Sequence, residues 1–329
     1  MSILVLGGAG YIGSHTVYEL IKNNTDVVIA DNLETGHRKA IHPKARFYKG
    51  DIRSHAFIDS VFEQEKIEAV IHFAANSLVG ESMENPLKYY DNNLGGTRVL
   101  LESMVKHDVK KIVFSSTAAT YGEPENIPIL EDDKTCPTNT YGETKLAMEK
   151  MMKWTDVAHG LKYVALRYFN ACGAHESGEI GEAHNPETHL IPLILQVPLG
   201  KREQIRVFGD DYDTKDGTCI RDYIHVTDLA QAHILSVKYL LDGNCSNTFN
   251  LGNGIGNTVK EVIETAKRAT GKDIKVEIVQ RRAGDPAQLI ASSAKAKEIL
   301  GWKPEHADLQ EIISSAWKWH SKYPNGYEK

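Results

Sequence analysis

The feature that most constrains the fold is a glycine-rich segment near the N-terminus. "ILVLGGAGYIGSH" places Gly7, Gly10 and Gly13 directly after an apolar run and at the opening of a helical pattern. Glycine permits the tight turn between strand and helix, and it lets backbone amides approach a diphosphate that the helix N-terminus attracts. The segment therefore predicts a strand, a phosphate-binding loop and a helix, which together open a dinucleotide-binding sheet.

Short apolar runs alternate with helical patterns through the first half of the chain. The expected strands cover 3–6, 26–31, 45–51, 69–75, 111–116 and 162–169, and the expected helices lie near 11–23, 54–65, 84–107 and 139–158. Strands separated by helices indicate βαβ units. We therefore expect an α/β fold with a Rossmann-like, doubly wound parallel sheet.

The regular alternation of apolar runs and helical patterns ends at about residue 170. A polar, glycine-rich stretch covers 170–189, and a run with proline and glycine follows it at 191–200. This shift predicts a dinucleotide-binding domain over 1–170 and a smaller C-terminal α/β substrate domain over 171–329, from which strands are allowed to cross back. A ligand cleft is expected between the two.

Composition excludes several classes of partner. The 329-residue chain is 41% hydrophobic and 25% charged, with a net charge of −6 and no basic block. A negative net charge repels phosphate backbones and anionic headgroups, so we predict no nucleic-acid partner and no membrane partner. The first apolar run stops at Gly7, which is too short for a signal peptide or a membrane span, so a cytoplasmic location is expected.

Neither the cysteines nor the histidines follow a metal-ligand pattern. Cys136, Cys172, Cys219 and Cys245 are far apart and form no C-x-x-C, so neither a disulfide framework nor a structural zinc site is indicated. Fourteen histidines are present, but none is arranged as H-E-x-x-H. We therefore predict no metal.

Two aspartates follow strands at positions that suit a nucleotide. Asp31 ends the second strand, where a carboxylate hydrogen-bonds the ribose hydroxyls of adenosine and repels a 2′-phosphate, so NAD is favoured over NADP. Asp51 follows the third strand, within reach of the adenine end. The alternative for both is an ordinary turn or cap aspartate. A second glycine pattern, "NLGNGIGN" at 250–257, lacks the following βα context and is interpreted as structural.

Tyr141 and Lys145 in "YGETK" lie four residues apart on a predicted helix, so both side chains reach one small volume. Lowering a phenol from its usual pKa near ~10 toward neutrality requires ~4 kcal/mol. A buried ammonium and the positive nicotinamide ring of NAD⁺ supply such an interaction. Tyr141 is then a general base and Lys145 also holds the nicotinamide ribose; the alternative is a solvated helix face. Ser116 and Thr117 follow the fifth strand, where a hydroxyl can relay the proton.

The sequence resembles the extended short-chain dehydrogenase/reductase family, and within it the UDP-sugar 4-epimerases, along essentially its whole length. The segments that carry the resemblance are "GGAGYIGSH", "DNL" at 31–33, "GDI", "HFAA", "YYDNN" at 89–93, "FSSTAATYG", "YGETK", "RYFNACGAH", "RDYIHVTDLA" and "RRAGD". The resemblance implies an isomerase that interconverts UDP-galactose and UDP-glucose. Such an enzyme oxidises the sugar at C4, lets the 4-keto sugar rotate, and returns the hydride to its other face while NAD stays bound.

The resemblance also assigns roles by position. It implies that Thr117, Tyr141 and Lys145 are catalytic. The implied cofactor-binding residues are Gly7, Gly10, Tyr11, Ile12, Gly13, Asp31, Asn32, Asp51, Ile52, Phe73, Ala74, Ala75, Asn92, Ser115, Tyr141, Lys145 and Tyr168.

The implied substrate contacts come mostly from the second half of the chain. They are Thr117, Tyr141, Asn170, His189, Leu190, Phe208, Arg221, Tyr223, Arg282, Asp285 and Leu289. Arg221 and Arg282 clasp the diphosphate, since a guanidinium presents a planar fork to it. Phe208 lies against the uracil; its alternative is a core position.

The chain departs from the family pattern at two places. Asn76 and Ser77 stand where some relatives carry a lysine near the cofactor phosphates, and His189 stands where an asparagine often meets the diphosphate. Both departures affect single contacts rather than the reaction. The resemblance further implies a homodimer formed through the helices near 84–107 and 139–158.

Leu289 bears on substrate breadth. In the family this position helps to set the room beside the C2 substituent of the sugar, and leucine leaves more space than tyrosine. We therefore expect activity on UDP-N-acetylhexosamines as well. The alternative is that Leu289 packs into the core of the second domain.

Rival functions remain within the same fold. A nucleotide-sugar dehydratase or a decarboxylating relative places a carboxylate after the Ser/Thr, where this chain has Ala118 and Ala119. A conventional reductase exchanges its cofactor with solvent. A non-catalytic, NAD-responsive binding protein is expected to have lost Tyr141 or Lys145, and both are present.

Overall fold

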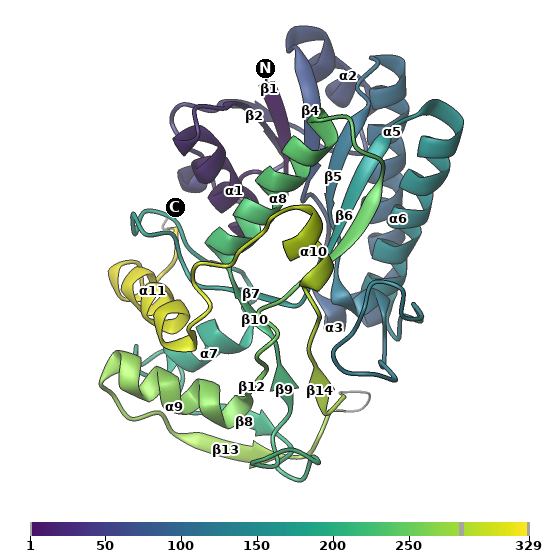
Figure 1. Ribbon diagram of the computed structural model, residues 1–329. Coiled ribbons are helices and arrows are strands. Elements are labelled where there is room, and N and C mark those ends of the chain that lie inside the picture. The colour runs from purple at the N-terminus through teal and green to yellow at the C-terminus, as the bar shows by residue number, and fades with distance from the viewer. Residues whose placement is uncertain (1, 283–285, 328–329) are drawn as a thin grey trace.

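The structure is a computed structural model that describes residues 2–282 and 286–327. Its centre is a seven-stranded sheet in the order β11-β6-β5-β4-β1-β2-β3 (Figure 1). The strands are β1 (Ser2–Leu6), β2 (Asp26–Asp31), β3 (Arg46–Lys49), β4 (Ile67–His72), β5 (Lys111–Ser115), β6 (Lys162–Tyr168) and β11 (Asn247–Leu251). Every neighbouring pair is parallel. The order 3-2-1-4-5-6 is that of a doubly wound dinucleotide-binding sheet, so the predicted fold class is confirmed.

Helices cover both faces of this sheet. The helices α1 (Tyr11–Lys22) and α8 (Val226–Leu241) pack on one face, whereas α2 (His55–Gln64), α5 (Gly96–Lys106) and α6 (Thr140–His159) pack on the other. Alternate residues of one strand serve opposite faces: Ile3 and Val5 belong to the first core, and Leu4 and Leu6 belong to the second. Burial on both sides explains why the strands read as continuous apolar runs.

The helix expected over 84–107 is divided into several pieces. It consists of α3 (Val79–Glu84), α4 (Pro86–Tyr89), a π-helical turn η2 (Tyr90–Gly95) and α5. Pro86 has no N–H and fits only the first turn of a helix, so a new helix begins there. Two short 3₁₀ turns, η1 (Arg38–Ala40) and η3 (Ala118–Thr120), complete this half of the molecule.

The rest of the chain forms a smaller α/β lobe beside the carboxyl ends of the strands. Its strands are β7 (Asn170–Cys172), β8 (Ile205–Phe208), β9 (Ile220–Arg221), β10 (Tyr223–His225), β12 (Asn257–Thr258), β13 (Val276–Val279) and β14 (Gln288–Leu289). Its helices are α7 (Leu190–Gln196), α9 (Val259–Thr270) and α11 (Leu309–Lys322), whereas α10 (Ala294–Ile299) packs beside β11 on the central sheet. Since α8 and β11 return to the central sheet, a cut near residue 170 does not separate two continuous chain segments.

The second glycine-rich segment binds a carboxylate of the protein itself. Asp222 accepts hydrogen bonds from the backbone N–H groups of Asn253, at 2.8 Å, and Gly254, at 3.1 Å. These amides therefore stabilise the turn after β11, in line with the structural interpretation. All four cysteines are free. Within residues 2–282 and 286–327, no helix has the length and apolar character that a membrane crossing requires.

Candidate active site

The glycine loop joins β1 to α1 at the carboxyl edge of the sheet. Gly7 has a φ of +78°, and a Cβ there would lie 2.7 Å from the backbone N of Ala74. A Cβ on Gly13 would lie 2.2 Å from the carbonyl oxygen of Gly7, so both positions require glycine. The N-cap of α1 is Gly10, and neither a capping side chain nor a first-turn acid occupies this end of the helix in the described chain. The open amides and the positive end of the helix fit the diphosphate of NAD.

Asp31 is fixed beside this loop. Its buried carboxylate accepts the N–H of Ala9 at 3.0 Å and the N–H of Leu33 at 2.8 Å. Burial raises the pKa of Asp31, and the two backbone hydrogen bonds oppose that shift. A carboxylate at this position beside the phosphate loop suits a pair of ribose hydroxyls. The side chain of Asn32 instead closes a local turn by accepting the N–H of Glu34 at 2.9 Å.

Asp51 is tied to a neighbour. Both of its carboxylate oxygens accept hydrogen bonds from Arg53, at 2.9 and 2.6 Å, and Arg53 also pairs with Asp91 at 2.6 Å. The Arg53 hydrogen bonds lower the pKa of Asp51, so the carboxylate stays ionised. Its predicted contact with adenine stays a prediction.

The remaining cofactor residues surround the same edge of the sheet. Ile12, Ile52, Phe73 and Ala74 pack into or against the two sheet cores, and Ala75 follows in the loop after β4. Tyr11 donates its hydroxyl to the carbonyl of Gly173 at 2.6 Å, which joins the phosphate loop to the second lobe.

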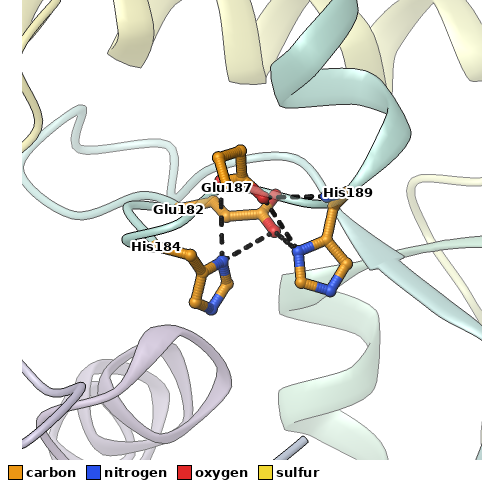
Figure 2. A group of neighbouring side chains, drawn as sticks. All are labelled: Glu182, His184, Glu187 and His189. Carbon is orange, nitrogen blue, oxygen red and sulfur yellow. Dashed lines mark hydrogen bonds and ion pairs between the residues drawn. The ribbon is translucent and has the colours of Figure 1, made fainter. Parts of the chain in front are cut away.

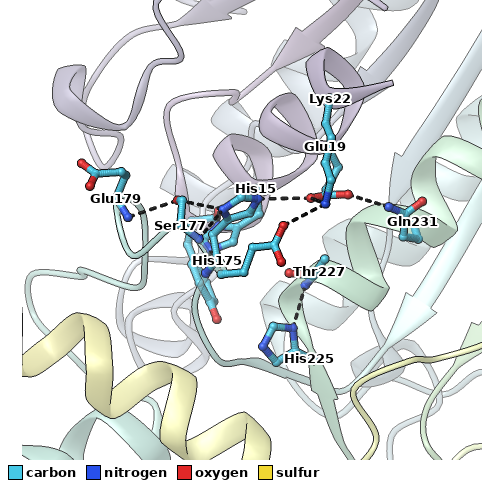
Figure 3. A network of polar contacts seen from close by, with 11 residues as sticks. His15, Glu19, Lys22, His175, Ser177, Glu179, His225, Thr227 and Gln231 are labelled. Carbon is cyan, nitrogen blue, oxygen red and sulfur yellow. Dashed lines mark hydrogen bonds and ion pairs between the residues drawn. The ribbon is translucent and has the colours of Figure 1, made fainter. Parts of the chain in front are cut away.

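Figure 3 shows a buried network behind the phosphate loop. His15 donates Nδ1–H to the carbonyl of Tyr11 at 2.7 Å, and its Nε2 accepts the N–H of His175 at 3.1 Å. His175 in turn contacts the Glu19 carboxylate at 3.1 Å, which also accepts a hydrogen bond from Gln231 at 2.7 Å. Burial lowers the pKa of His15 to about 3, so this imidazole is neutral. The network fastens α1 to α8 and to the segment after β7.

The structure brings Thr117, Tyr141 and Lys145 together. Asn139 caps α6 by accepting the N–H of Gly142 at 2.9 Å, and Ser82 of α3 accepts the N–H of Tyr141 at 3.1 Å. The phenol ring then lies 5.8 Å from the ammonium of Lys145. Burial raises the pKa of Tyr141, and a hydrogen bond with the Thr117 side chain opposes the shift.

Lys145 is buried against the carboxyl end of β5. Its Nζ donates to the carbonyl of Ser115 at 2.8 Å and lies 4.9 Å from the ring of Phe114. Burial lowers the pKa of Lys145 to about 7, and the Glu149 carboxylate counteracts part of that shift. Ser115 also shares a 2.5 Å hydrogen bond with the hydroxyl of Tyr168. The groups assigned to catalysis and to the nicotinamide end therefore form one contiguous set.

The two hydroxyls that follow β5 have different surroundings. Ser116 donates to Glu149 at 2.5 Å, and Glu149 forms a buried bidentate pair with Arg167 at 3.0 and 2.7 Å. Thr117 instead accepts the N–H of Ala119 at 3.1 Å and contacts Tyr141. Ser116 is thus committed to a structural network, whereas Thr117 lies at the phenol.

Asn93, to which the sequence analysis assigned no role, links three segments at the carboxyl edge of the sheet. Asn93, fully buried in the π-helical turn, accepts the N–H of Asn76 at 2.8 Å and donates to the side chain of Thr144 at 3.1 Å. Asn92 donates to Asn93 at 3.1 Å, and Ser77 is exposed in the adjoining loop. The motif "YYDNN" pointed to the segment, but periodicity does not reveal a π-helical turn.

Several predicted substrate residues meet in the smaller lobe. The guanidinium carbon of Arg282 lies 3.9 Å from the ring centre of Phe208. Arg221 on β9 donates to the carbonyl of Ile220 at 2.7 Å, and Asn170 donates its side chain to the carbonyl of Asp222 at 3.0 Å. Asp285 lies outside the described residues.

Leu289 and Tyr223 occupy different environments. Leu289 on β14 is half-buried and packs against a small buried cluster of Ala118, Tyr121 and Ile129. Leu289 therefore packs against this cluster, which begins one residue after Thr117, and not against the core of the smaller lobe. Tyr223 is buried within that core, and burial raises its pKa.

His189 and Leu190 mark the start of α7. His189 is the N-cap residue, and Leu190 packs against the core of the smaller lobe. The imidazole of His189 lies among Glu182, His184 and Glu187, three residues that the sequence analysis did not single out (Figure 2). Burial disfavours the charged imidazoles, but the carboxylates outweigh it and raise the pKa of His184 to about 9 and that of His189 to about 10.

Comparison with known proteins agrees with this geometry. The sequence profile of the NAD dependent epimerase/dehydratase family matches residues 3–252. The chain is 59% identical over 327 residues to a UDP-glucose 4-epimerase of Lacticaseibacillus casei, with 99% of each chain covered. A crystal structure of a UDP-glucose 4-epimerase matches with a TM-score of 0.99 at 58% identity and full coverage of both chains. That of the Bifidobacterium longum enzyme with NAD⁺ and UDP matches with a TM-score of 0.93 at 41% identity, covering 99% and 100%.

Proposed function

Since this chain belongs to the NAD dependent epimerase/dehydratase family, we propose that it interconverts UDP-galactose and UDP-glucose by transient oxidation of the sugar at C4. The observation that carries this proposal is the contact of Thr117 with Tyr141 beside the buried ammonium of Lys145. The three side chains lie at the carboxyl edge of the sheet, where doubly wound folds bind their ligands. The cofactor is NAD.

When bound, NAD supplies a hydride acceptor for the oxidation and a hydride donor for the reduction that follows. The protein supplies the proton transfer. The phenolic oxygen of Tyr141 takes the proton of the C4 hydroxyl, with Thr117 as the relay, and returns it in the second half of the cycle. Because burial alone raises the pKa of Tyr141, the phenol needs nearby positive charge to act as a base. The ammonium of Lys145 lies 5.8 Å from the phenol ring, and its hydrogen bond to the carbonyl of Ser115 fixes its position.

The turn after β5 favours epimerisation over elimination. A dehydratase needs an acid–base carboxylate next to the catalytic hydroxyl, and this chain has Ala118 and Ala119 in the 3₁₀ turn η3 instead. The nearby Glu149 is bonded to Ser116 and Arg167, so its carboxylate is not directed to the substrate side. Oxidation followed by return of the hydride is therefore the outcome that these residues support.

Substrate recognition follows from the cations and aromatic rings of the smaller lobe. We assign Arg221 and Arg282 to the diphosphate and Phe208, stacked on Arg282, to the uracil. Asn170, His189, Leu190 and Tyr223 are assigned to the remaining contacts with the nucleotide sugar.

The experiment that tests the proposal uses the purified protein without added cofactor. Incubation with UDP-galactose is expected to yield UDP-glucose, because the hydride leaves and returns within one cycle and NAD stays bound through desalting. A protein that emerges free of NAD, needs NAD⁺ for each turnover and accumulates NADH would overturn the assignment in favour of a conventional dehydrogenase.

We also propose activity on UDP-N-acetylhexosamines. Leu289 packs against the cluster of Ala118, Tyr121 and Ile129, which begins one residue after Thr117, so its size bears on the room available to a substituent of the sugar. A leucine there leaves space that a tyrosine ring would fill.

Finally, we propose that the protein is a cytoplasmic homodimer. Val79, Met83, Leu87 and Tyr90 are exposed on α3, α4 and η2, and these elements pack beside α6, where Trp154 and Val157 are exposed. Large apolar side chains that gather on neighbouring helices mark an association surface.

A further inference from the structure

Four side chains with metal-ligating atoms converge in the loop between β7 and α7, as Figure 2 shows. Glu182, His184, Glu187 and His189 each offer one donor atom, and all four atoms lie within 4.8 Å of one another. We propose that this cluster binds a divalent first-row transition cation, with Zn²⁺ as the expected occupant, and that the bound ion is structural. No step of the proposed reaction uses the cation. The two proposals share His189, which is also assigned to a contact with the nucleotide sugar.

The spacing of the donor atoms matches a four-coordinate centre. Oε1 of Glu182 lies 3.3 Å from Nδ1 of His184 and 3.0 Å from Nδ1 of His189. Glu187 lies 3.6 and 3.0 Å from the same two nitrogens. In a tetrahedral zinc site with bonds of ~2.0–2.2 Å, neighbouring ligand atoms are about 3.4 Å apart. The four side chains need only small adjustments to surround one ion.

Two of these atoms are buried without a hydrogen bond. Oε1 of Glu182 and Nδ1 of His184 have no hydrogen-bond partner among the described residues, and the Glu182 side chain is only 4% exposed. Oε1 of Glu182 and Nδ1 of His184 are 3.3 Å apart, which is close enough for an ion pair, but the two atoms form no hydrogen bond with each other. Buried polar atoms are normally satisfied. A cation at the common centre satisfies both at once.

The donor set selects the class of cation. Imidazole nitrogens suit Zn²⁺ and its first-row neighbours, whereas Ca²⁺ and Mg²⁺ favour shells of oxygen ligands. Four protein ligands leave no open position, which is the arrangement of structural zinc sites. Two backbone hydrogen bonds fix the orientation of the Glu187 carboxylate: its Oε1 accepts the N–H groups of Thr188 and His189 at 2.8 and 2.9 Å. Such outer-shell contacts orient the ligands of a metal.

The cluster lies between an open pocket and the first residue of α1. His184 lines an open pocket of about 450 Å³ together with His37 and Tyr327. On its other side, the His184 ring meets the ring of Tyr11 edge to face, with centroids 6.1 Å apart. A bound ion would therefore secure the start of α7 next to the phosphate loop.

The spacing E-x-H-x-x-E-x-H explains why the sequence analysis predicted no metal. Ligand patterns are recognised most easily when a helix or a tight turn repeats them, and here an irregular loop folds the ligands together.

The test is metal binding by the untagged, full-length protein with its NAD. After treatment with a chelator, calorimetric titration with ZnCl₂ is expected to show one ion per chain at micromolar or lower concentration, and zinc should raise the midpoint of thermal unfolding. His184→Ala and Glu182→Gln are expected to weaken binding by at least about 100-fold, since loss of a supporting contact alone costs roughly 10–100-fold. His306→Ala is the matched control, because His306 also contacts a carboxylate, that of Glu311 at 2.6 Å.

Three outcomes would overturn the site. A wild-type protein that binds no zinc at these concentrations contains only an ion-pair cluster of imidazolium and carboxylate groups. Equal binding by the wild type and His184→Ala means adventitious binding to surface histidines. Retained NAD reports whether the variants fold. If they do not, Co²⁺ added to the wild type decides the question, since a tetrahedral site absorbs strongly in the visible range and a weak octahedral spectrum rejects the proposal.

Discussion

At the scale of single residues, the proposed mechanism assigns the acid–base chemistry to Tyr141. Replacing Tyr141 with Phe keeps the ring and removes the titrating oxygen. We expect kcat to fall roughly 10²–10⁴-fold, the usual contribution of a positioned acid or base. The measurement is the rate of UDP-glucose formation by a variant that retains NAD and the wild-type circular dichroism. Undiminished turnover in such a protein would move the base to Thr117 or to a water molecule.

We propose that Lys145 sets the pH range in which Tyr141 acts as a base. The Lys145 ammonium lies 5.8 Å from the phenol ring, and burial lowers its own pKa to about 7. A positive charge there lowers the pKa of the phenol, so Lys145→Met should shift the pH optimum of kcat upward. Lys150→Met, an exposed change on the same helix, is the control and should leave the optimum in place. An unchanged optimum in Lys145→Met would show that the nicotinamide charge alone controls the phenol.

Leu289 provides the test of substrate breadth. Leu289→Tyr places a ring against the cluster of Ala118, Tyr121 and Ile129, so activity on UDP-N-acetylglucosamine should fall far more than activity on UDP-glucose. The kcat/KM ratio for the two sugars is the measurement. An equal loss on both sugars would mean that the substitution disturbs packing, and a wild type without activity on the N-acetyl sugar would reject the idea.

At the scale of the elements, the strands were predictable because burial on both faces leaves an unbroken apolar run. The glycine loop was also predictable, since a turn of that geometry requires glycine at Gly7 and Gly13. The role of Asp31 at the ribose stays a prediction. The division of the helix over 84–107 was not predictable from the sequence. The π-helical turn depends on the hydrogen bonds of Asn93 with Asn76 and Thr144, which are distant in sequence. The cluster around Glu182 was missed for a similar reason, since the fold alone brings its members together.

The attachment of α1 to the loop after β7 predicts a pH dependence of stability. His15 has a pKa of about 3 in the folded protein, whereas an unfolded histidine titrates near ~6.5. The unfolded state therefore binds the extra proton first as the pH falls. The contribution of His15 is complete above pH ~6.5 and declines below it by up to about 1.4 kcal/mol per pH unit until pH ~3 is approached.

His15→Gln keeps a donor and an acceptor but removes the titrating group. Urea unfolding between pH 7.5 and pH 4.5 should therefore show a free energy of unfolding that falls less steeply than that of the wild type, in a window taken from the two pKa values above. His159→Gln, a change at an exposed position, is the matched control. Identical slopes for the wild type and His15→Gln would mean that His15 also accepts a proton in the folded state.

At the scale of the whole molecule, the division into two parts was only partly accessible from the sequence. The alternation of strand and helix patterns ends at about residue 170, where the smaller lobe begins. However, α8 and β11 return to the large sheet and bury Leu229 and Phe249 in its core. Apolar patterns show that a segment is buried without showing against which sheet it packs. The large sheet and the smaller lobe are consequently built from segments that alternate along the chain.

The exposed apolar residues of α4 and α6 predict the assembly of the molecule. Leu87 is 79% exposed and Trp154 is 65% exposed, which is costly for side chains of this size unless a second copy covers them. Sedimentation at micromolar concentration should give the mass of a dimer. Leu87→Glu and Trp154→Glu each place a charge on the proposed contact and should shift the equilibrium toward the monomer. Ile255→Glu, at a residue that is 60% exposed elsewhere, should leave it unchanged. A wild type that sediments as a monomer, or a dimer that both variants leave intact, would rule out these helices as the interface.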